Sequence, residues 1–158
     1  MKTLCALLIL MTLFSNQAFA LLTSRLSFSS GSMQKRDAPS NSFSELDLGL
    51  RYRFDETFSL QASYLARFVE NDERYSGAQL ILPISLELGD SRYSLESYLA
   101  PGYRFISGYQ APLVEGGIGI KLNIFRIGVG YRSIFNGLVK NGLEDESQLF
   151  IFTTLGVL

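Results

Sequence analysis

The segment ELDLGLRYRF, residues 45–54, alternates strictly between two kinds of side chain. Even-numbered positions carry leucine or an aromatic residue, and odd-numbered positions carry an acid, glycine or arginine. Successive side chains of a β-strand point to opposite faces, so this alternation predicts a strand with one apolar and one polar face. In a soluble sandwich or barrel the apolar face would point inward, whereas in a membrane barrel it would point outward to lipid. The apolar set is Leu46, Leu48, Leu50, Tyr52 and Phe54, and the polar set is Glu45, Asp47, Gly49, Arg51 and Arg53.

The same two-residue period recurs eight times along the chain, and no stretch shows a sustained helical period of about 3.6 residues. Most of the predicted strands span about 11 to 15 residues, against roughly 5 to 6 in a usual soluble protein. A bilayer requires strands of about 9 to 11 residues tilted by roughly 45°. The strand length therefore favours a membrane barrel. The predicted strands are residues 22–30, 43–54, 58–69, 77–88, 91–105, 112–122, 125–135 and 147–158.

The connections between these strands alternate in length. Tight links are predicted at 55–57, 89–90 and 123–124, whereas the intervening links are longer and polar, as at 31–42 and 136–146. An up-and-down barrel with short periplasmic turns and longer external loops produces this alternation. A Greek-key sandwich has no comparable reason to alternate.

The parity of the polar positions predicts the register across each short turn, because paired residues must share a face. An odd link is needed at 55–57, and an even link of two residues fits at 89–90. Asn123 and Ile124 make a poor two-residue turn, so a four-residue turn is the alternative there. The predicted pairs are Phe54 with Phe58, Glu87 with Arg92, Gly119 with Gly128, Gly117 with Gly130, and Glu115 with Arg132.

The two faces differ in composition throughout the chain. One face is almost free of charge, and the other mixes glycine and serine with arginine, lysine and glutamate. Glycine weakens a water-facing strand, whereas a glycine opposite a long arginine would make room for it inside a crowded barrel. Aromatic residues gather near both strand ends, as in the interfacial girdles of outer-membrane barrels. The charges of residues 45–54 are therefore predicted to point into a polar lumen.

The first 20 residues, MKTLCALLILMTLFSNQAFA, have the layout of a cleavable secretory signal. Lys2 precedes an apolar run at 4–14, and Ala18 and Ala20 flank the expected cleavage site. The alternative is a transmembrane helix, which needs about 20 apolar residues and so a longer run. The only cysteine, Cys5, lies in this leader, so the mature chain, residues 21–158, is expected to lack disulfides.

Charge and histidine content bear on the class of function. The chain has 14 Lys and Arg against 15 Asp and Glu, a formal net charge of −1, which suggests no nucleic-acid partner. Histidine is absent from the sequence. Outer-membrane lipases, lipid A deacylases and proteases resemble one another in using histidine as a base, since its pKa suits proton transfer near neutrality. We therefore expect no enzyme activity and no catalytic, cofactor-binding or metal-binding residues; a serine with a carboxylate partner is the catalytic alternative.

The alternating strands and loops of residues 21–158 resemble the small eight-stranded outer-membrane barrels of the OmpA and OmpX type. The resemblance implies an all-β fold, an eight-stranded antiparallel up-and-down transmembrane β-barrel, in the porin-like class of the Gram-negative cell envelope. It also implies outer-membrane lipid and lipopolysaccharide as surroundings, and the barrel-assembly machinery as a partner in insertion. Such barrels commonly end on an aromatic residue that this machinery recognises, whereas this chain ends LFIFTTLGVL. Its last strand is apolar on both parities, which leaves the facing of that strand open.

The predicted lumen carries an excess of cations over carboxylates. Buried charges need partners or water, and eight strands enclose a space that side chains fill. We therefore expect a salt-bridged structural plug; the alternative is a narrow channel for small solutes that favours anions. The predicted lumen charge network is Arg51, Arg67, Glu87, Arg92, Glu96, Arg104, Glu115, Lys121 and Arg132, joined by Arg25, Arg53, Arg126, Glu45 and Asp47.

The long loops offer a surface for external binding, and the sequence indicates no particular ligand. Acidic clusters formed by Glu70, Asp72 and Glu73 and by residues 144–146 are expected to be solvated, with divalent ions at lipopolysaccharide phosphates as the alternative. Their spacing matches no calcium loop. The alternative fold is a soluble lipocalin-type barrel, which would line a ligand cavity with the apolar face.

Overall fold

The segment that shows the alternation forms most of the second strand in the computed structural model. The structure describes residues 22–35, 39–70, 74–90, 92–106, 109–136 and 145–157, so the predicted signal peptide and Leu158 lie outside the described residues. Within these ranges the chain forms nine strand segments. They are β1 (Leu22–Lys35), β2 (Asn41–Arg53), β3 (Ser59–Val69), β4 (Arg74–Ile81), β5 (Ile84–Gly89), β6 (Tyr93–Ile106), β7 (Tyr109–Leu122), β8 (Phe125–Ile134) and β9 (Glu146–Val157).

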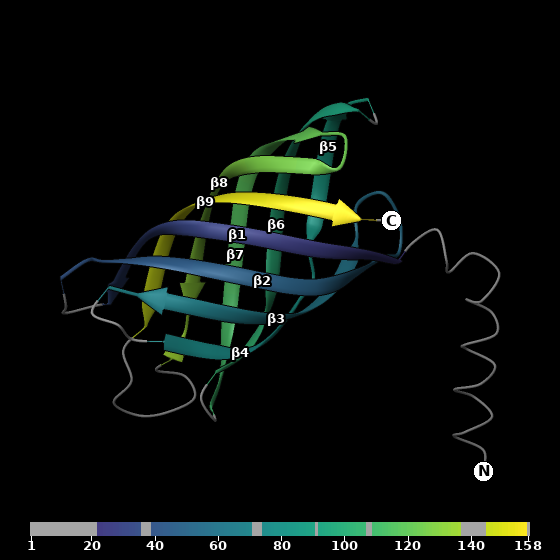
Figure 1. The fold of residues 1–158 in the computed structure, drawn as a ribbon. Helices are drawn as coiled ribbons and strands as arrows, with labels where there is room; N and C mark the ends of the chain where they lie inside the picture. Colours follow the sequence, from purple (N-terminus) through teal and green to yellow (C-terminus); the bar gives the residue numbers. More distant parts are fainter. Residues whose placement is uncertain are drawn as a thin grey trace, which may run out of the picture.

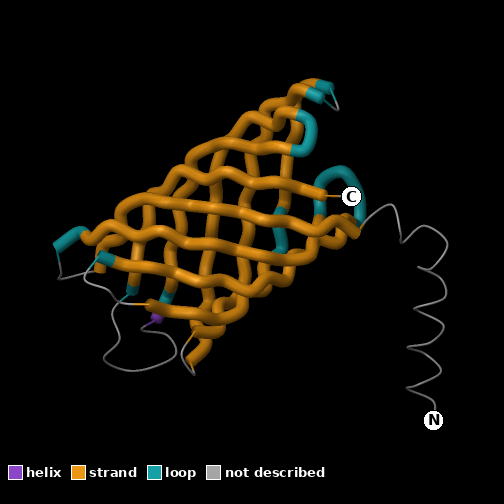
Figure 2. Tube along the Cα trace, in the orientation of Figure 1, coloured by secondary structure: helices purple, strands orange, loops and turns teal. Residues whose placement is uncertain are grey.

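The strands form one antiparallel sheet that closes into a barrel (Figure 1). Strand β1 pairs with both β2 and β9, which joins the first strand to the last. Strands β4 and β5 both pair with β6, and the remaining neighbours follow chain order. In Figure 2 the strands cross as the front and back walls of the barrel, with loops and turns at its two ends. Closure removes the unpaired edges of an open sheet.

Segments β4 and β5 are two parts of one barrel strand. The register against β6 continues unchanged from the pair Ile81 and Gly102 to the pair Ile84 and Leu99. Pro83, in the gap, has no N–H to donate to the ladder, although its carbonyl accepts a hydrogen bond from the Ser59 N–H at 3.0 Å. The barrel therefore has the eight strands that the sequence predicts, and a proline interrupts the predicted strand 77–88.

The strands are strongly staggered around the barrel. Successive cross-strand partners lead from Thr23 through Arg51, Gln61, Ile81, Gly102, Leu113, Ile134 and Glu146 to Lys35, twelve residues farther along β1. The corresponding stagger of the eight-stranded TIM barrel is about 8. At a fixed number of strands, a larger stagger means that the strands tilt more strongly from the barrel axis and that the interior is wider. This interior therefore has room for long charged and aromatic side chains.

Two of the three predicted short-turn registers are confirmed. Between β2 and β3, the Phe54 N–H donates to the Phe58 carbonyl at 2.9 Å, as the odd link requires. Between β7 and β8, the three predicted pairs are all present, so the turn is the two-residue form. Asn123 lies in the left-handed region with a φ of 60°, a conformation that asparagine tolerates better than most residues.

The register predicted between β5 and β6 is wrong by four residues. Glu87 lies opposite Glu96 instead of Arg92, so the turn is longer than two residues. The cause is Asp90, whose Oδ1 accepts hydrogen bonds from the N–H groups of Arg92 and Tyr93, each at 2.7 Å. The turn between β2 and β3 has the same Asp-x-x-aromatic sequence and the same pair of hydrogen bonds.

The apolar face of the strands points outward. Leu48, Leu86 and Ile118 are 60, 65 and 56% exposed, while buried polar and charged residues outnumber buried apolar ones among the described residues. This inverts the usual distribution of a soluble protein and suits a lipid-facing surface. The predicted facing is confirmed, and the lipocalin-type alternative is wrong. No helix within the described residues is long and apolar enough to cross a membrane.

The last strand, whose facing the sequence leaves open, follows the same rule. Leu149 and Ile151 of β9 are 60 and 59% exposed, whereas Phe150 and Phe152 are buried inside the barrel. The interior thus receives two aromatic rings in addition to the predicted charges.

Candidate functional site

Glu45 of β2 lies at the centre of a network of buried charges. Its carboxylate accepts hydrogen bonds from Arg67 at 2.9 Å, from Arg132 at 2.9 Å, and twice from Arg104 at 3.0 Å. The contact with Arg104 is bidentate, which is the strong form of an arginine–carboxylate pair. The side chains of Glu45 and Arg104 are only 1 and 2% exposed. One carboxylate thus holds three arginines in a site where water offers little stabilisation.

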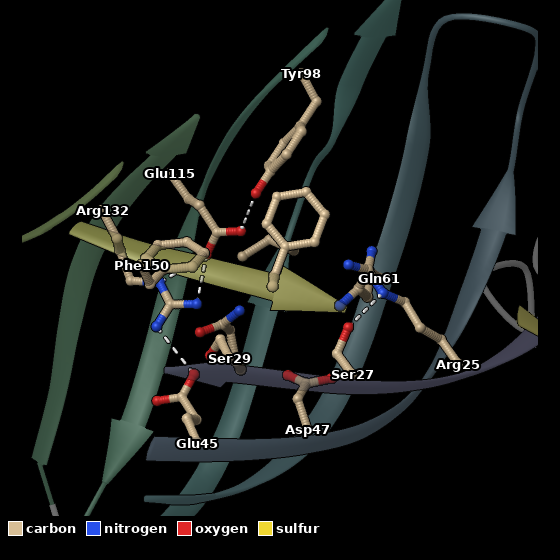
Figure 3. Close-up of a pocket in the computed structure, with 13 residues that line it drawn as sticks. Arg25, Ser27, Ser29, Glu45, Asp47, Gln61, Tyr98, Glu115, Arg132 and Phe150 are labelled. Atoms are coloured by element: carbon tan, nitrogen blue, oxygen red, sulfur yellow. Dashed lines mark hydrogen bonds and ion pairs between the residues drawn. The ribbon is translucent and has the colours of Figure 1, made fainter. Parts of the chain in front are cut away.

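Two further carboxylates balance these arginines. Glu146 pairs with Arg67 at 2.7 Å, and Glu115 pairs with Arg132 at 2.6 Å. Figure 3 shows the guanidinium of Arg132 between Glu115 and Glu45, with the Tyr98 hydroxyl donating to Glu115 from the other side at 2.8 Å. We call this group the loop-side network, because Arg67 and Glu146 lie at the strand ends nearest the long loops. Its members are Glu45, Arg67, Arg104, Glu115, Arg132 and Glu146.

A second group of charges lies near the short turns. Lys121 pairs with Glu87 at 3.0 Å and Arg126 with Glu96 at 2.9 Å. The turn-side network comprises these four residues together with Arg51 and Arg53 of β2. Arg51 also donates to the hydroxyls of Ser59 and Ser85, at 2.9 and 3.1 Å.

Aromatic rings fill the barrel between the two networks. On β7 and β8, the inward-facing positions between the networks are glycines 117, 119, 128 and 130. A Cβ at Gly130 would lie 2.6 Å from the Phe150 ring, and one at Gly128 would lie 2.7 Å from the Phe152 ring. The sequence-based expectation that lumen glycines make room for arginines is therefore wrong at these positions, where they make room for aromatic rings. Tyr98 packs edge-on against Phe152 at a centroid distance of 5.9 Å.

One arginine and one aspartate occupy the middle of the barrel outside both networks. Arg25 donates to Gln61 at 2.7 Å and to Thr154 at 3.2 Å, and Asp47 accepts a hydrogen bond from Ser63 at 2.7 Å. Both line a cavity of about 30 Å³ that Phe150 and Phe152 also line, and Figure 3 shows this pocket. A volume of this size holds about one or two water molecules. The buried Oδ1 of Asp47 has no hydrogen-bond partner among the described residues, and a water molecule in this cavity can satisfy it.

Comparison of the sequence with protein families and with curated proteins finds no match. Solved structures do match. The outer-membrane enzyme PagL is 13% identical, with a TM-score of 0.64 over 84% of this chain and 99% of PagL. A de novo designed transmembrane β-barrel is 14% identical, with a TM-score of 0.59 over 85% of this chain and 95% of the design. Neisserial surface protein A is 10% identical, with a TM-score of 0.53 over 85% and 96% of the two chains.

The fold is that of a small outer-membrane β-barrel. At these identities the likeness concerns the fold alone, and the similar structures include an enzyme, a surface protein and a design without natural ancestry. An outer-membrane barrel carries charges inside and apolar side chains toward lipid, which is the arrangement found here.

The barrel interior contains all but one member of the predicted lumen charge network. Arg67, Arg104, Arg132 and Glu115 meet in the loop-side network, and Arg51, Glu87, Glu96 and Lys121 meet in the turn-side network. The exception is Arg92, which is exposed in the turn that precedes β6. Its placement in the lumen was wrong because Asp90 lengthens that turn and moves the start of β6 beyond it.

Sequence reasoning missed Glu146 as a lumen residue and assigned it to an external acidic cluster. It is 8% exposed and pairs with Arg67. The alternation along β9 could have placed Glu146 in the lumen. Glu146, Gln148 and Phe150 face inward, whereas Ser147 and Leu149, which lie between them, face outward. Gln148 extends the loop-side network by donating to Glu146 and accepting from Arg132 at 3.0 Å.

The other acidic loop residues are described only in part. Asp72, Glu73 and Glu144 lie outside the described residues. Glu70 accepts hydrogen bonds from the Ser42 N–H at 3.2 Å and from the Ser42 hydroxyl at 2.9 Å, and these bonds lower the pKa of the Glu70 carboxyl. Within the described residues, no group of three or more His, Cys, Asp or Glu side chains is arranged to hold a metal ion.

Proposed function

We propose that this chain is an integral outer-membrane β-barrel whose charged lumen is a closed structural plug, and that its role is structural or lies in surface interactions. One observation carries the proposal: the residues with large exposed apolar side chains encircle a barrel whose interior holds paired charges. An apolar outer surface is stable only against lipid, and paired interior charges tie the walls together.

The side chains inside the barrel support a plug over a channel. Glu45 of β2 pairs with Arg67 on the neighbouring strand β3 and reaches across the lumen to Arg104 on β6 and Arg132 on β8. Phe150 and Phe152 lie between the two charged networks, where an ion in transit would lose its water and meet apolar rings. The cavities near these rings measure about 30 and 10 Å³, enough for isolated water molecules.

Single-channel recording tests this proposal. The protein is folded in detergent, its closed form is checked by the heat-dependent shift in gel mobility, and it is inserted into a planar bilayer. We expect a folded barrel that gives no discrete current steps. Salt-dependent steps would instead support the narrow, anion-favouring channel, and Arg51, Arg104 and Arg132 would then be the residues to exchange for tests of selectivity.

We also propose that the barrel is not an enzyme. The chain contains no histidine, so a serine nucleophile would need another base. The most exposed groups of the lumen are engaged in ion pairs, as Arg53 is with Glu87. Mass spectrometry of envelope lipids from cells with and without the protein provides the test. Identical lipid profiles are expected, and a modified lipid A that depends on the protein would contradict this part of the proposal.

Lipopolysaccharide is the proposed partner of the outer surface near the long loops. There the outward-facing residues change from apolar side chains to serine: Ser30 lies opposite Ser44, and Ser133 lies opposite Ser147. Hydroxyl groups can hydrogen-bond to the sugars and phosphates of a glycolipid headgroup. Replacing all four serines by alanine should lower the amount of lipopolysaccharide that copurifies with the folded barrel. Unchanged copurification would remove the support for this contact.

The barrel-assembly machinery is the proposed route of insertion. A closed barrel with an apolar exterior must reach the membrane without exposing its unpaired strands to water. In cells depleted of this machinery, the heat-modifiable form of the protein should decline. An undiminished folded fraction would indicate insertion by another route.

A further inference from the structure

The turn-side network contains four cations and two carboxylates. Lys121 and Arg126 make the short ion pairs in this network, at 3.0 and 2.9 Å. Arg51 and Arg53 reach the same two carboxylates only at 3.9 and 3.7 Å. The surplus of two positive charges therefore lies on β2, at these two arginines.

The strand register explains why the surplus is on this side of the barrel. Two pairs of like charges face each other directly across neighbouring strands: Glu87 with Glu96, and Lys121 with Arg126. Like charges in that position repel, but here the acidic pair and the basic pair neutralise each other. The cross-strand partners of Arg51 and Arg53 on β3 are a glutamine and a serine, which carry no charge.

The surplus charge is accessible from the short-turn end of the barrel. The Arg53 side chain is 39% exposed, Lys121 is 17% exposed and Arg51 is 7% exposed, so exposure falls in steps from the mouth inward. Beyond them lies a cavity of about 10 Å³ whose lining combines Arg51 and Arg126 with two glutamates. A solute that enters at this end meets Arg53 first and then a guanidinium that is nearly buried.

Three acidic residues on the short turns, Asp55, Glu56 and Asp90, lie at the same end. Asp55 and Asp90 each accept two backbone hydrogen bonds at 2.7 Å, which direct these carboxylates toward their own turns. All three are exposed, so salt screens their charges over about 8 Å at physiological ionic strength. Among the described residues, Arg53 makes an ion pair with Glu87 alone. The turn acids therefore leave the surplus at the mouth in place.

We propose that the short-turn mouth of the barrel is a binding site for a small phosphate-like anion, held between Arg51 and Arg53 and bordered by Lys121. A guanidinium presents a planar fork of donors that matches phosphate and carboxylate oxygens, and such charge-assisted bonds are strong in partly buried sites. The anion neutralises the two positive charges that Glu87 and Glu96 leave unbalanced in the turn-side network. This site is reached from the short-turn end and does not depend on whether the lumen conducts.

The test measures binding of inorganic phosphate to the purified protein folded in detergent, by calorimetry at low and at physiological salt. Arg53→Gln removes a surplus charge at the exposed mouth and should weaken binding about tenfold, the effect of losing one charge-assisted hydrogen bond. Arg74→Gln is the matched control, because Arg74 is an exposed arginine near the long loops. It should leave the affinity unchanged.

A second variant gives an effect of opposite sign. Glu87→Gln removes a carboxylate that competes with the anion for Arg53 and Lys121, so phosphate should bind more tightly. The heat-dependent gel shift confirms that each variant is folded. Three outcomes would overturn the proposal: no phosphate binding to the wild-type barrel, equal weakening by Arg53→Gln and Arg74→Gln, or weaker binding after Glu87→Gln. If a phospholipid headgroup is the natural source of the phosphate, glycerophosphate will compete with inorganic phosphate; if free phosphate is, it will not.

Discussion

Arg104 of β6 holds Glu45 of β2 through two parallel hydrogen bonds, Nη1 to Oε2 and Nη2 to Oε1, each 3.0 Å long. The two strands are not neighbours in the sheet, so this pair spans the interior and fixes the distance between two walls. Gln79 Oε1 accepts two further bonds from Arg104, at 2.9 and 2.6 Å. The guanidinium is thus held in one orientation from two strands.

Removing the central carboxylate should be costly. Glu45→Gln keeps the shape of the side chain but leaves Arg67, Arg104 and Arg132 with one negative charge fewer in a buried site. Loss of one partner of a buried ion pair typically costs about 3–5 kcal/mol, and we expect a loss of that size in the free energy of unfolding. Urea unfolding of the barrel in lipid vesicles measures it. The control is Glu87→Gln, whose side chain is 25% exposed and which should cost no more than about 1 kcal/mol; equal losses would contradict the different roles assigned to the two networks.

The fit between the lumen glycines and the aromatic rings predicts an epistatic pair. At Gly130, a Cβ would meet three Phe150 ring atoms between 2.6 and 3.3 Å away. Gly130→Ala should therefore destabilise the barrel by about 1–3 kcal/mol, as overpacking does. The double variant Gly130→Ala with Phe150→Leu should recover part of that loss, because the smaller side chain vacates the space. A double-mutant cycle by urea unfolding measures the coupling, and strictly additive losses would show that the ring is not what the glycine accommodates.

The outward facing of the apolar residues predicts a depth-dependent cost for charge. Ile118 lies in the middle of β7 and is 56% exposed. In a lipid bilayer, Ile118→Arg should cost about 2–4 kcal/mol, whereas an arginine near the interface costs about 0–1 kcal/mol. Ser32→Arg, on the outward face near the long loops, is the control. Folding free energies in lipid vesicles provide the comparison, and a harmless Ile118→Arg would mean that this surface does not face lipid.

The sequence predicts the wall of the barrel better than its contents. Side-chain alternation has a period of two wherever one face is buried, so eight strands, their facing and the two correct turn registers follow from parity alone. The register at β5 and β6 does not follow, because it depends on one hydrogen-bonding side chain, Asp90, that parity ignores. The misplacement of Arg92 is a consequence of that one turn.

The lumen shows a second limit. Parity assigns a residue to the interior, but it does not say which interior residues meet. Glu45 pairs with arginines on three strands. The stagger of the whole barrel determines which arginines it meets, and the order of residues in the sequence does not. Glu146 was missed because it is the first residue of β9 and follows an acidic loop, so the alternation extends from it in one direction only.

The turn that overturned the predicted register also predicts a dependence of stability on pH. The Asp90 carboxylate accepts hydrogen bonds from the backbone N–H groups of Tyr93 and Arg92, which lower its pKa below the ordinary value of 3.8. Because the folded pKa is the lower one, this carboxylate contributes stability that is fully present above about pH 4 and is lost as the pH falls through the folded pKa. Asp90→Asn should therefore be less stable than wild type at pH 6, and the difference should shrink as the pH falls below about 4. Urea midpoints of both proteins between pH 6 and pH 2 measure it, with Glu56→Gln in the turn between β2 and β3 as the control. A difference that stays constant over this range would mean that ionised Asp90 does not stabilise the turn.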